Sequence, residues 1–386
     1  VQLGLLLISV DISQAYLWSR MPLHERMPIR MPLHRRKYDK ITGEELYRVL
    51  LGSCYGCPQS SRVWGNLRDE WFLTQFNGKG WTCTKSRRDP CLFIFTHSKS
   101  AKSKYARAGR YMDHIHAYTT GDPSTADADA DADAKAPRLM RKHGFDNPTV
   151  NYTLLVVHSD DLDIVGQDKA DIDYIATRLH DRFKITHGDP QFMLGLKRVV
   201  SKDGKSIEIN QQAYVEGMVN DFSGYVAKKR TPSTPFPPGM YLSKQEPDKI
   251  DVKESKRVHK ELKFLSLVGQ LLWASRMTFI ECAIGCHYLT RQLANPTVEA
   301  FEAGIHMLAY MNANKTKGIK FSKVKDPTLV TYYDASNRGD TQDKMKAVGG
   351  HVVLMCNGPL LWSSKKLGHV GQSSSHNEYM QLAEAT

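Results

Sequence analysis

The stretch LLVVHSDDLDIVG, residues 154–166, places two adjacent carboxylates between two apolar runs. The apolar runs have the length and composition of strands, so Asp160 and Asp161 are predicted at the connection of a strand pair. Like charges in contact repel, and each raises the pKa of the other unless something compensates. Two explanations stay open from these residues alone. One is an exposed hairpin tip that water screens, and the other is a divalent cation, since Mg²⁺ commonly binds one or two carboxylates together with phosphates.

A third carboxylate, Asp11, ends the apolar strand predicted over residues 3–12. Its side chain is expected at the edge of a sheet, in reach of other strand ends. Two metal ions about 4 Å apart can stabilise both the attacking and the leaving oxygen of a phosphoryl transfer. An Asp at the end of a strand, with an Asp–Asp pair well downstream, is therefore moderately specific for a two-metal site.

Length and charge bound the class of protein. A chain of 386 residues can hold two or three domains of about 100–200 residues each. The formal net charge of +12 favours a polyanionic partner, most commonly a nucleic acid, although solubility alone would also explain it. No apolar run reaches 18 residues, so no membrane span is predicted. The first residue, Val1, already lies inside an apolar run, which is expected of a fragment cut within a domain.

The seven cysteines form no disulfide framework and suit a reducing compartment. Cys54 and Cys57 have the C-x-x-C spacing of a metal or redox site. Free thiols near a turn explain the same spacing, and both interpretations stay open.

Periodicity and turn residues predict the remaining elements. Residues 13–45 are expected to be a loop containing near copies of Arg-Met-Pro, and residues 97–150, which include ADADADADA, to be a mobile insertion. A Pro-rich linker is predicted over 231–239. Hairpin turns are predicted at Asp203–Gly204 and Asn357–Gly358. Helices are predicted over residues 58–76, 168–183, 211–222, about 260–292, and about 297–313, with a further helix beginning near residue 373.

Taken together, these segments resemble the reverse transcriptase of copia-type retrotransposons. VDISQAYL (10–17) is similar to the family's D-V-K-x-A-F-L, and VVHSDDLDIVG (156–166) to its Y-V-D-D-x-x-I-x-G. Further similar segments are GSCYGCPQSSRVW (52–64), RRDPCLFIF (87–95), residues 192–219, SLVGQLLWAS (266–275) and LTRQLANPTVEAF (289–301). The resemblance covers nearly the whole chain except residues 17–40 and 97–150.

The resemblance implies an α+β fold in three parts. Residues 1–230 would form a polymerase palm with an antiparallel sheet and incomplete fingers. Residues 231–325 would form the linker and a helical thumb or connection. Residues 326–386 would form the first part of a ribonuclease H-like α/β domain. An intracellular location, in cytoplasmic particles with access to the nucleus, would follow.

The same resemblance implies a function as an RNA-directed DNA polymerase. Asp11, Asp160 and Asp161 would be the catalytic, metal-binding triad for two Mg²⁺ ions, with Mn²⁺ as a substitute. A primer 3′-hydroxyl would attack the α-phosphate of a dNTP, and the partners would be an RNA template, a DNA primer and the RNA–DNA hybrid. Tyr16 matches the aromatic residue that closes against the sugar, and Gln59 matches the Gln of the loop that touches template and nucleotide. Plain core packing for Tyr16 and an exposed turn for Gln59 are the alternatives.

The segment from Thr331 onward resembles the ribonuclease H domain that follows the polymerase in this family. By that resemblance Asp334 and Glu378 would be catalytic carboxylates that bind metal. Further acidic ligands are expected beyond Thr386, so this domain is predicted to be incomplete and inactive, with an unpaired edge strand.

Some positions depart from the family pattern. His158 stands in place of a Tyr, Cys57–Pro58 in place of Leu-Lys, and His376 in place of a Glu. Two alternatives to an active polymerase follow: a catalytically inactive retrotransposon remnant that at most binds nucleic acid, and a zinc-containing binding module built on Cys54 and Cys57.

Overall fold

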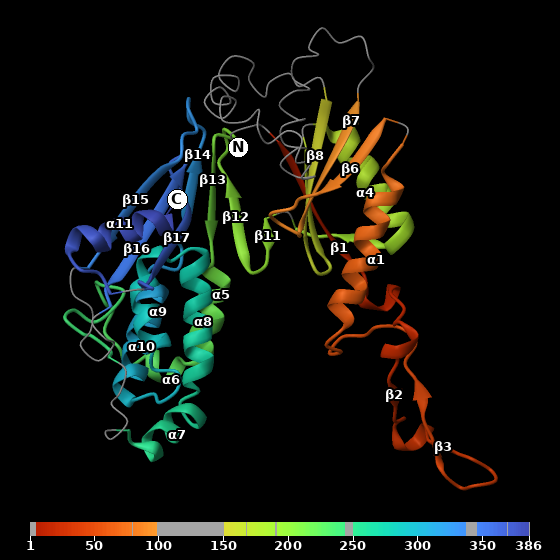
Figure 1. Cartoon of the computed structure of the whole chain (residues 1–386), viewed down its shortest axis with the longest axis horizontal. Coiled ribbons are helices and arrows are strands. Elements are labelled where there is room, and N and C mark those ends of the chain that lie inside the picture. Colours follow the sequence, from red (N-terminus) through yellow and green to blue (C-terminus); the bar gives the residue numbers. More distant parts are fainter. Residues whose placement is uncertain are drawn as a thin grey trace. The chain divides into compact units, whose positions relative to one another are not determined.

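The computed structural model divides the chain into two compact units, Leu3–Pro190 and Gln191–Thr386 (Figure 1). The residues it describes are 5–78, 80–98, 150–166, 168–189, 191–243, 250–336, 346–368 and 370–385. The insertion predicted over 97–150 falls on residues 99–149, outside the described residues, apart from its two ends. Among the described helices, none combines the length and the apolar character needed to cross a membrane.

The first unit is built on a six-stranded sheet in which every neighbouring pair is antiparallel. The strand order is β10-β1-β9-β8-β7-β6. The strands are β1 (Leu6–Ile12), β6 (Trp81–Lys85), β7 (Leu92–Ser98), β8 (Val150–His158), β9 (Asp161–Gly166) and β10 (Ile185–His187). The strand predicted at the amino-terminal end and the strand pair around Asp160 and Asp161 are confirmed. They lie side by side, because β1 pairs directly with β9.

Two helices, α1 (Ser60–Gln75) and α4 (Lys169–Phe183), pack on one face of this sheet (Figure 1). The helix predicted over 168–183 is confirmed as α4, and its apolar stripe is buried along its length and joins the core under the sheet. Asp168 caps the start of α4 by accepting a hydrogen bond from the backbone N–H of Ala170. The buried members of the stripe are Ile172, Ile175, Leu179 and Phe183.

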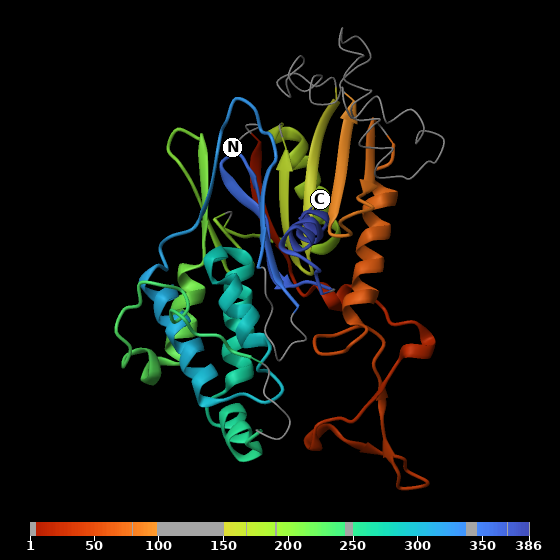
Figure 2. The ribbon, with the colours of Figure 1, turned by 60° about the vertical axis from the view of Figure 1, so that its left-hand side comes forward.

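The segment predicted as a plain loop over 13–45 instead contains short elements, and that prediction was wrong. It forms two small hairpins in an arm that extends from the sheet (Figures 1 and 2). They pair β2 (Pro28–Ile29) with β5 (Arg48–Val49), and β3 (Lys37–Tyr38) with β4 (Glu45–Leu46).

The near copies of Arg-Met-Pro in this arm form the same local structure twice. The copies at 20–22 and 30–32, which are both followed by Leu-His, make a 3₁₀ turn after the proline, over Leu23–Glu25 and Leu33–Arg35, whereas the proline of the copy at 26–28 begins β2. In the first copy Arg26 Nε donates to the carbonyl of Met21 at 3.3 Å. In the second, Arg36 Nε donates to Met31 at 3.2 Å. The turns therefore follow from the repeated sequence, although no hydrophobic periodicity predicts them.

The second unit begins with a four-stranded sheet in the order β11-β12-β13-β14. Its strands are β11 (Phe192–Met193), β12 (Leu196–Val200), β13 (Ser206–Asn210) and β14 (Ile319–Ser322). The hairpin predicted at Asp203–Gly204 is confirmed between β12 and β13. Asp203 Oδ1 accepts from the Lys205 N–H at 3.0 Å, and Gly204 takes φ +65°.

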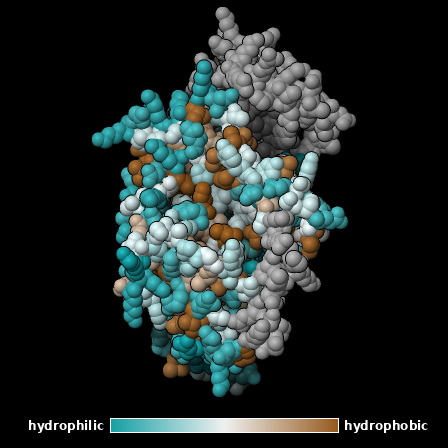
Figure 3. Space-filling model, turned by 90° about the vertical axis from the view of Figure 1, so that its left-hand side faces the viewer, coloured by the Kyte–Doolittle hydropathy of each residue, from teal (hydrophilic) through white to brown (hydrophobic). Residues whose placement is uncertain are grey.

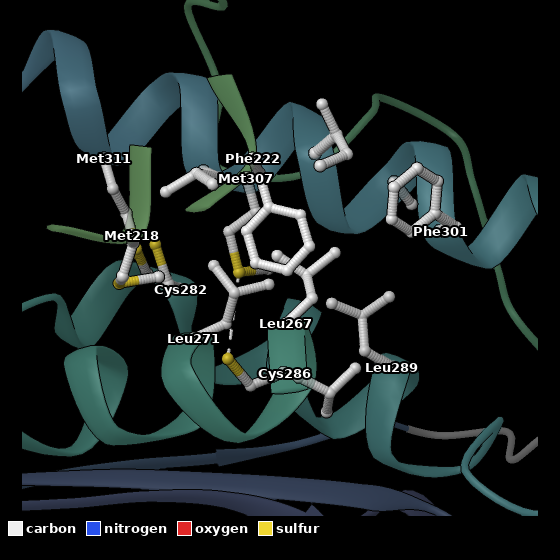
Figure 4. Close-up of a cluster of buried hydrophobic side chains, with 14 of the residues drawn as sticks. Met218, Phe222, Leu267, Leu271, Cys282, Cys286, Leu289, Phe301, Met307 and Met311 are labelled. Carbon is white, nitrogen blue, oxygen red and sulfur yellow. Dashed lines mark hydrogen bonds between the residues drawn. The ribbon is translucent and has the colours of Figure 1, made fainter. Parts of the chain in front are cut away.

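Helices gather around a core of this unit rich in Met, Cys, Leu and Phe (Figure 4). They are α5 (Gln212–Asp221), α6 (Ser223–Val226), α7 (Val252–Lys260), α8 (Phe264–Met277), α9 (Ala283–Thr290) and α10 (Val298–Ala313). The prediction of a single helix over about 260–292 was wrong, because the helix ends at Met277 and a new helix, α9, begins at Ala283. Thr278 leaves helical geometry and its hydroxyl donates to the buried Gln211 side chain at 2.8 Å, which fixes the break.

The last part of this unit is a three-stranded sheet covered by α11 (Ser374–Ala385). Its strands are β15 (Val330–Ala335), β16 (Val348–Met355) and β17 (Gly358–Lys366). On the face of this unit shown in Figure 3, apolar side chains are interspersed with polar ones.

The hairpin predicted at Asn357–Gly358 exists, but its turn lies one residue earlier. Met355 pairs with Gly358, so Cys356 and Asn357 are the central residues, at φ +53° and +63°. These positive values are those of a type I′ turn. Gly358 belongs to the strand, and a Cβ there would come within 2.5 Å of the Lys320 carbonyl oxygen.

Candidate active site

The predicted carboxylates meet where β1 ends and β9 begins. Asp11 and Asp161 are direct partners in the antiparallel register, so their side chains leave the same face of the sheet. Asp160 precedes Asp161 in the turn, and its carbonyl accepts from the Ile12 N–H at 2.9 Å. The structure therefore brings together three acidic residues that are remote in the sequence.

This acidic face is opposite to the one that the helices cover. Val10, Ile12 and Leu162, the immediate neighbours in the two strands, are buried in the core with α1 and α4. Because side chains alternate along a strand, Asp11 and Asp161 emerge from the other face. Asp161 is exposed, and Asp11 is half-buried.

The three carboxylates interact electrostatically. Partial burial, and then repulsion from Asp160 and Asp161, raise the pKa of Asp11. Burial and repulsion from Asp160 likewise raise the pKa of Asp161, while the nearby His158 opposes this shift. The carboxylates therefore repel one another at this end of the sheet, and His158 offsets part of this repulsion at Asp161. Among the described residues, however, no three His, Cys, Asp or Glu side chains converge closely enough to form a metal site as they stand.

A network from α1 and the segment after β1 fixes the turn that carries Asp160. Ser159 adopts φ +59°, an unusual conformation for a residue other than glycine. The buried Trp64 of α1 donates its indole N–H to the Ser159 carbonyl at 2.9 Å. The hydroxyls of Tyr16 and Ser159 lie 2.9 Å apart, within hydrogen-bonding distance. The structure thus places Tyr16, predicted as a sugar-contacting residue, at the base of the Asp–Asp turn.

Tyr55 is a site residue that the sequence interpretation missed. Its hydroxyl donates to Asp160 Oδ2 at 3.3 Å, and its ring packs edge-on to Tyr16 at 4.7 Å. It lies on a loop anchored by Ser53, whose hydroxyl donates to the Tyr16 carbonyl at 2.5 Å. No local pattern indicates this role, because Tyr55 and Asp160 are 105 residues apart in the sequence.

Gln59 lies at the start of α1, on the same loop. Its side-chain amide points toward Met21 and donates to the Glu25 carbonyl at 3.5 Å. The structure therefore directs it toward the base of the arm and not toward the carboxylates. The two sulfur atoms of Cys54 and Cys57 lie 3.2 Å apart in the same loop, and no third metal-binding side chain joins them among the described residues.

The second predicted pair, Asp334 and Glu378, occupies neighbouring elements of the other unit. Asp334 lies in β15 and lines a cavity of about 960 Å³. Its neighbour Ala335 points to the opposite face, where it packs with Met380 of α11. By strand alternation Asp334 therefore faces away from the helix that carries Glu378. The structure brings the two elements together but leaves the two carboxylates on different sides of the sheet.

Comparison with known proteins places the chain among transposon sequences. No family model matches it. It is 29% identical over 236 residues to the retrovirus-related Pol polyprotein from transposon TNT 1-94 of Nicotiana tabacum, covering 61% of this chain and 17% of that protein. It is 25% identical over 236 residues to the corresponding polyprotein from transposon RE1 of Arabidopsis thaliana, covering 60% of this chain and 15% of that protein.

A shorter match covers a different kind of protein. Over 127 residues the chain is 30% identical to the secreted RxLR effector protein 161 of Plasmopara viticola, covering 33% of this chain and 89% of that protein. The matches over 234 to 236 residues are to Pol polyproteins, of which the chain spans only 15–17%. The chain is homologous to the retrovirus-related Pol polyproteins of plant transposons, which supports its origin as part of a copia-type retrotransposon Pol protein.

Proposed function

We propose that the Leu3–Pro190 unit is the palm of an RNA-directed DNA polymerase. The observation that carries this proposal is the pairing of Asp11 with Asp161, next to Asp160, on the open face of an antiparallel sheet. Homology to transposon Pol polyproteins supports the same interpretation.

The carboxylates fit a pair of divalent cations by their chemistry. All three offer oxygen ligands, which Mg²⁺ and Mn²⁺ prefer. Burial and then mutual repulsion raise the pKa of Asp11 and of Asp161, and a bound cation would relieve the repulsion. Asp11 and Asp160 would hold the ions, with Asp161 in support. When bound, such ions neutralise charge on the attacking and leaving oxygens of phosphoryl transfer.

The chain's own residues would prepare this site. Trp64 and Tyr16 hold the turn that presents Asp160. Tyr55 contacts both Tyr16 and Asp160, so these two tyrosines border the turn that carries the carboxylates. We infer that Tyr16 borders the sugar of the incoming dNTP and that Gln59 acts on the template side, toward the arm. The substrates would be an RNA template and a DNA primer.

For the carboxyl-terminal part of the chain, we propose a ribonuclease H-like domain. Asp334 and Glu378 would bind metal for hydrolysis of the RNA strand of a hybrid. Their placement on opposite sides of the sheet means that cleavage would require a rearrangement that brings them to one face.

The test of the polymerase proposal is primer extension on an RNA template with Mg²⁺ or Mn²⁺. We expect dNTP incorporation by the unaltered chain and its loss in Asp160→Asn. Asp173→Asn is a matched control, because Asp173 lies on α4 in an exposed ion pair with Lys169. Incorporation that persists in Asp160→Asn at the unaltered rate would refute the role assigned to this residue.

A non-catalytic nucleic-acid-binding remnant is the second candidate. The net charge of +12 favours it, as does His158, which replaces an aromatic residue directly across the strand pair from Asp161. It predicts binding of an RNA–DNA hybrid that weakens steeply with salt, with no incorporation in either metal. Binding without turnover would select this candidate, and turnover would exclude it.

A further inference from the structure

The loop that carries Tyr55 contains two cysteines with adjacent sulfur atoms. The Sγ atoms of Cys54 and Cys57 lie 3.2 Å apart, and neither residue is fully buried. Cys83, Cys282, Cys286 and Cys356 are buried by contrast, and Cys91 is exposed. The pair therefore combines proximity with access to solvent.

The backbone between the two cysteines suits closure of a disulfide ring. The Cys57 N–H donates to the Cys54 carbonyl at 3.3 Å, which makes a four-residue turn. Such a turn keeps its first and fourth Cα atoms within about 7 Å, and disulfides usually span Cα separations of about 4.4–6.8 Å. Closure would shorten the sulfur separation to about 2.05 Å, a movement of roughly one ångström.

Gly56 supplies the freedom that this movement needs. It adopts φ +89° at the third position of the turn, a conformation that glycine reaches without strain. Space around its Cα is open, since a Cβ there would meet nothing within 4 Å. The flanking chain is anchored, because Ser60 Oγ donates to the Cys54 carbonyl at 2.7 Å. The turn can therefore adjust while its ends stay in place.

We propose that Cys54 and Cys57 form a reversible redox site that a low-molecular-weight disulfide such as oxidised glutathione converts to a disulfide. One thiolate attacks a sulfur of oxidised glutathione, forms a mixed disulfide and releases one glutathione thiolate. The other protein thiolate then displaces the second glutathione. Two protein thiols are oxidised by two electrons, one glutathione disulfide is reduced to two thiols, and the two protons pass to the glutathione sulfurs.

The position of the pair links it to the carboxylate site. Tyr55 lies between the two cysteines, and its hydroxyl reaches Asp160. Ring closure would restrict the turn that presents Tyr55, so the oxidised and reduced chains would differ in the freedom of this contact. The redox chemistry itself does not depend on polymerase activity.

The test is thiol mapping of the full chain after exchange with oxidised glutathione, followed by alkylation and mass spectrometry. Trypsin cuts after Arg48 and Arg62, so both cysteines fall in one peptide. We expect this peptide to lose two hydrogens and to resist alkylation, and reduction to restore both thiols. Cys91 serves as an internal control, because it should exchange without forming a ring.

Single substitutions make the assignment specific. In Cys57→Ser we expect Cys54 to stop at the mixed disulfide with glutathione, and Cys54→Ser should trap Cys57 in the same way. Cys91→Ser should leave closure of the ring unchanged. Full alkylation of both cysteines after exchange, or a mixed disulfide that persists in the unaltered chain, would overturn the proposal.

Discussion

Asp11 in β1 lies directly across the strand pair from Asp161 in β9, so two like charges face each other in the register. Like charges placed directly opposite on a sheet are destabilising. Two residues further along the same face, Ser9 Oγ donates to the buried Asp163 at 2.5 Å. The Asp11–Asp161 pair is thus destabilising, whereas the neighbouring Ser9–Asp163 pair is stabilising. This is expected where a fold loses stability to form a functional site.

The first prediction is that Asp11→Asn stabilises the metal-free protein. The substitution removes one of two opposed charges and keeps the size of the side chain. We expect the free energy of unfolding in urea with chelator to rise by about 0.2–1 kcal/mol. Asp163→Asn is the contrasting variant and should lower it, because it weakens a buried hydrogen bond. A lower stability for Asp11→Asn would contradict the repulsion inferred from the register.

The pH dependence of stability follows from the same carboxylates. The folded-state pKa of Asp11 and of Asp161 is raised by burial and mutual repulsion. Between the unfolded and the raised folded pKa, the native state binds more protons, so the contribution of these groups to stability falls as pH rises through that window. We expect Asp11→Asn to gain most over the unaltered chain above the window and to lose that advantage below it. Urea unfolding measured across acidic pH checks this.

Divalent cations should offset the loss of stability that repulsion between Asp11 and Asp161 causes at neutral pH. A ligand that binds only the folded state stabilises it by about 2.7 kcal/mol at 100 times its dissociation constant. We expect Mn²⁺ or Mg²⁺ to raise the melting temperature of the unaltered chain, and the increase to shrink in Asp160→Asn and Asp11→Asn. Asp173→Asn should respond as the unaltered chain does. Equal responses in all variants would show that the ions bind elsewhere.

The carboxylate site could be predicted because its parts lie at the ends of apolar runs. Asp11 ends one such run, and Asp160 and Asp161 separate two others, so the sequence pattern placed all three at strand ends. The helix α4 could be predicted equally well, because the buried apolar residues of its stripe recur with the helical period.

Other parts left no periodic signal. The strand β6 reads Trp-Thr-Cys-Thr-Lys, too short and polar to be recognised alone. The break after Met277 depends on a contact between Thr278 and Gln211, which are 67 residues apart. Tyr55 reaches Asp160 only through the tertiary fold. Long-range side-chain contacts of this kind are not encoded in any local window.

Trp64 should be needed for the shape of the Asp–Asp turn. Trp64→Phe removes the indole donor to the Ser159 carbonyl and leaves a partly buried acceptor without this bond, which costs about 1–3 kcal/mol. Trp71→Phe is the matched control, since Trp71 of the same helix contacts Phe72, Phe76 and Phe183 through its ring. We expect both variants to be less stable in urea, but only Trp64→Phe to weaken Mn²⁺ stabilisation. Equal Mn²⁺ responses would mean that the indole hydrogen bond does not position the carboxylates.

Gly358 tests where the turn between β16 and β17 lies. The Asn-Gly signal predicts that Gly358 is a central turn residue, but in the structure it is the first residue of β17, packed against Lys320 and Phe321 of β14. A Cβ at Gly358 would lie 2.5 Å from the Lys320 carbonyl oxygen and 2.6 Å from the Phe321 ring. Backbone atoms cannot give way as a flexible side chain can, so β14 and β17 must separate.

We therefore expect Gly358→Ala to destabilise the second unit by about 1–3 kcal/mol through overpacking. Gly368→Ala is the control, because a Cβ there meets nothing within 4 Å. Amide hydrogen exchange distinguishes two explanations for a loss of stability in Gly358→Ala, overpacking against β14 and strain in the turn. Overpacking should accelerate exchange in β14 as well as in β17, since Ser322 N–H bonds to the Cys356 carbonyl beside this contact. Turn strain alone would affect only β16 and β17, and protection of β14 unchanged from the unaltered chain would refute the packing role assigned to Gly358.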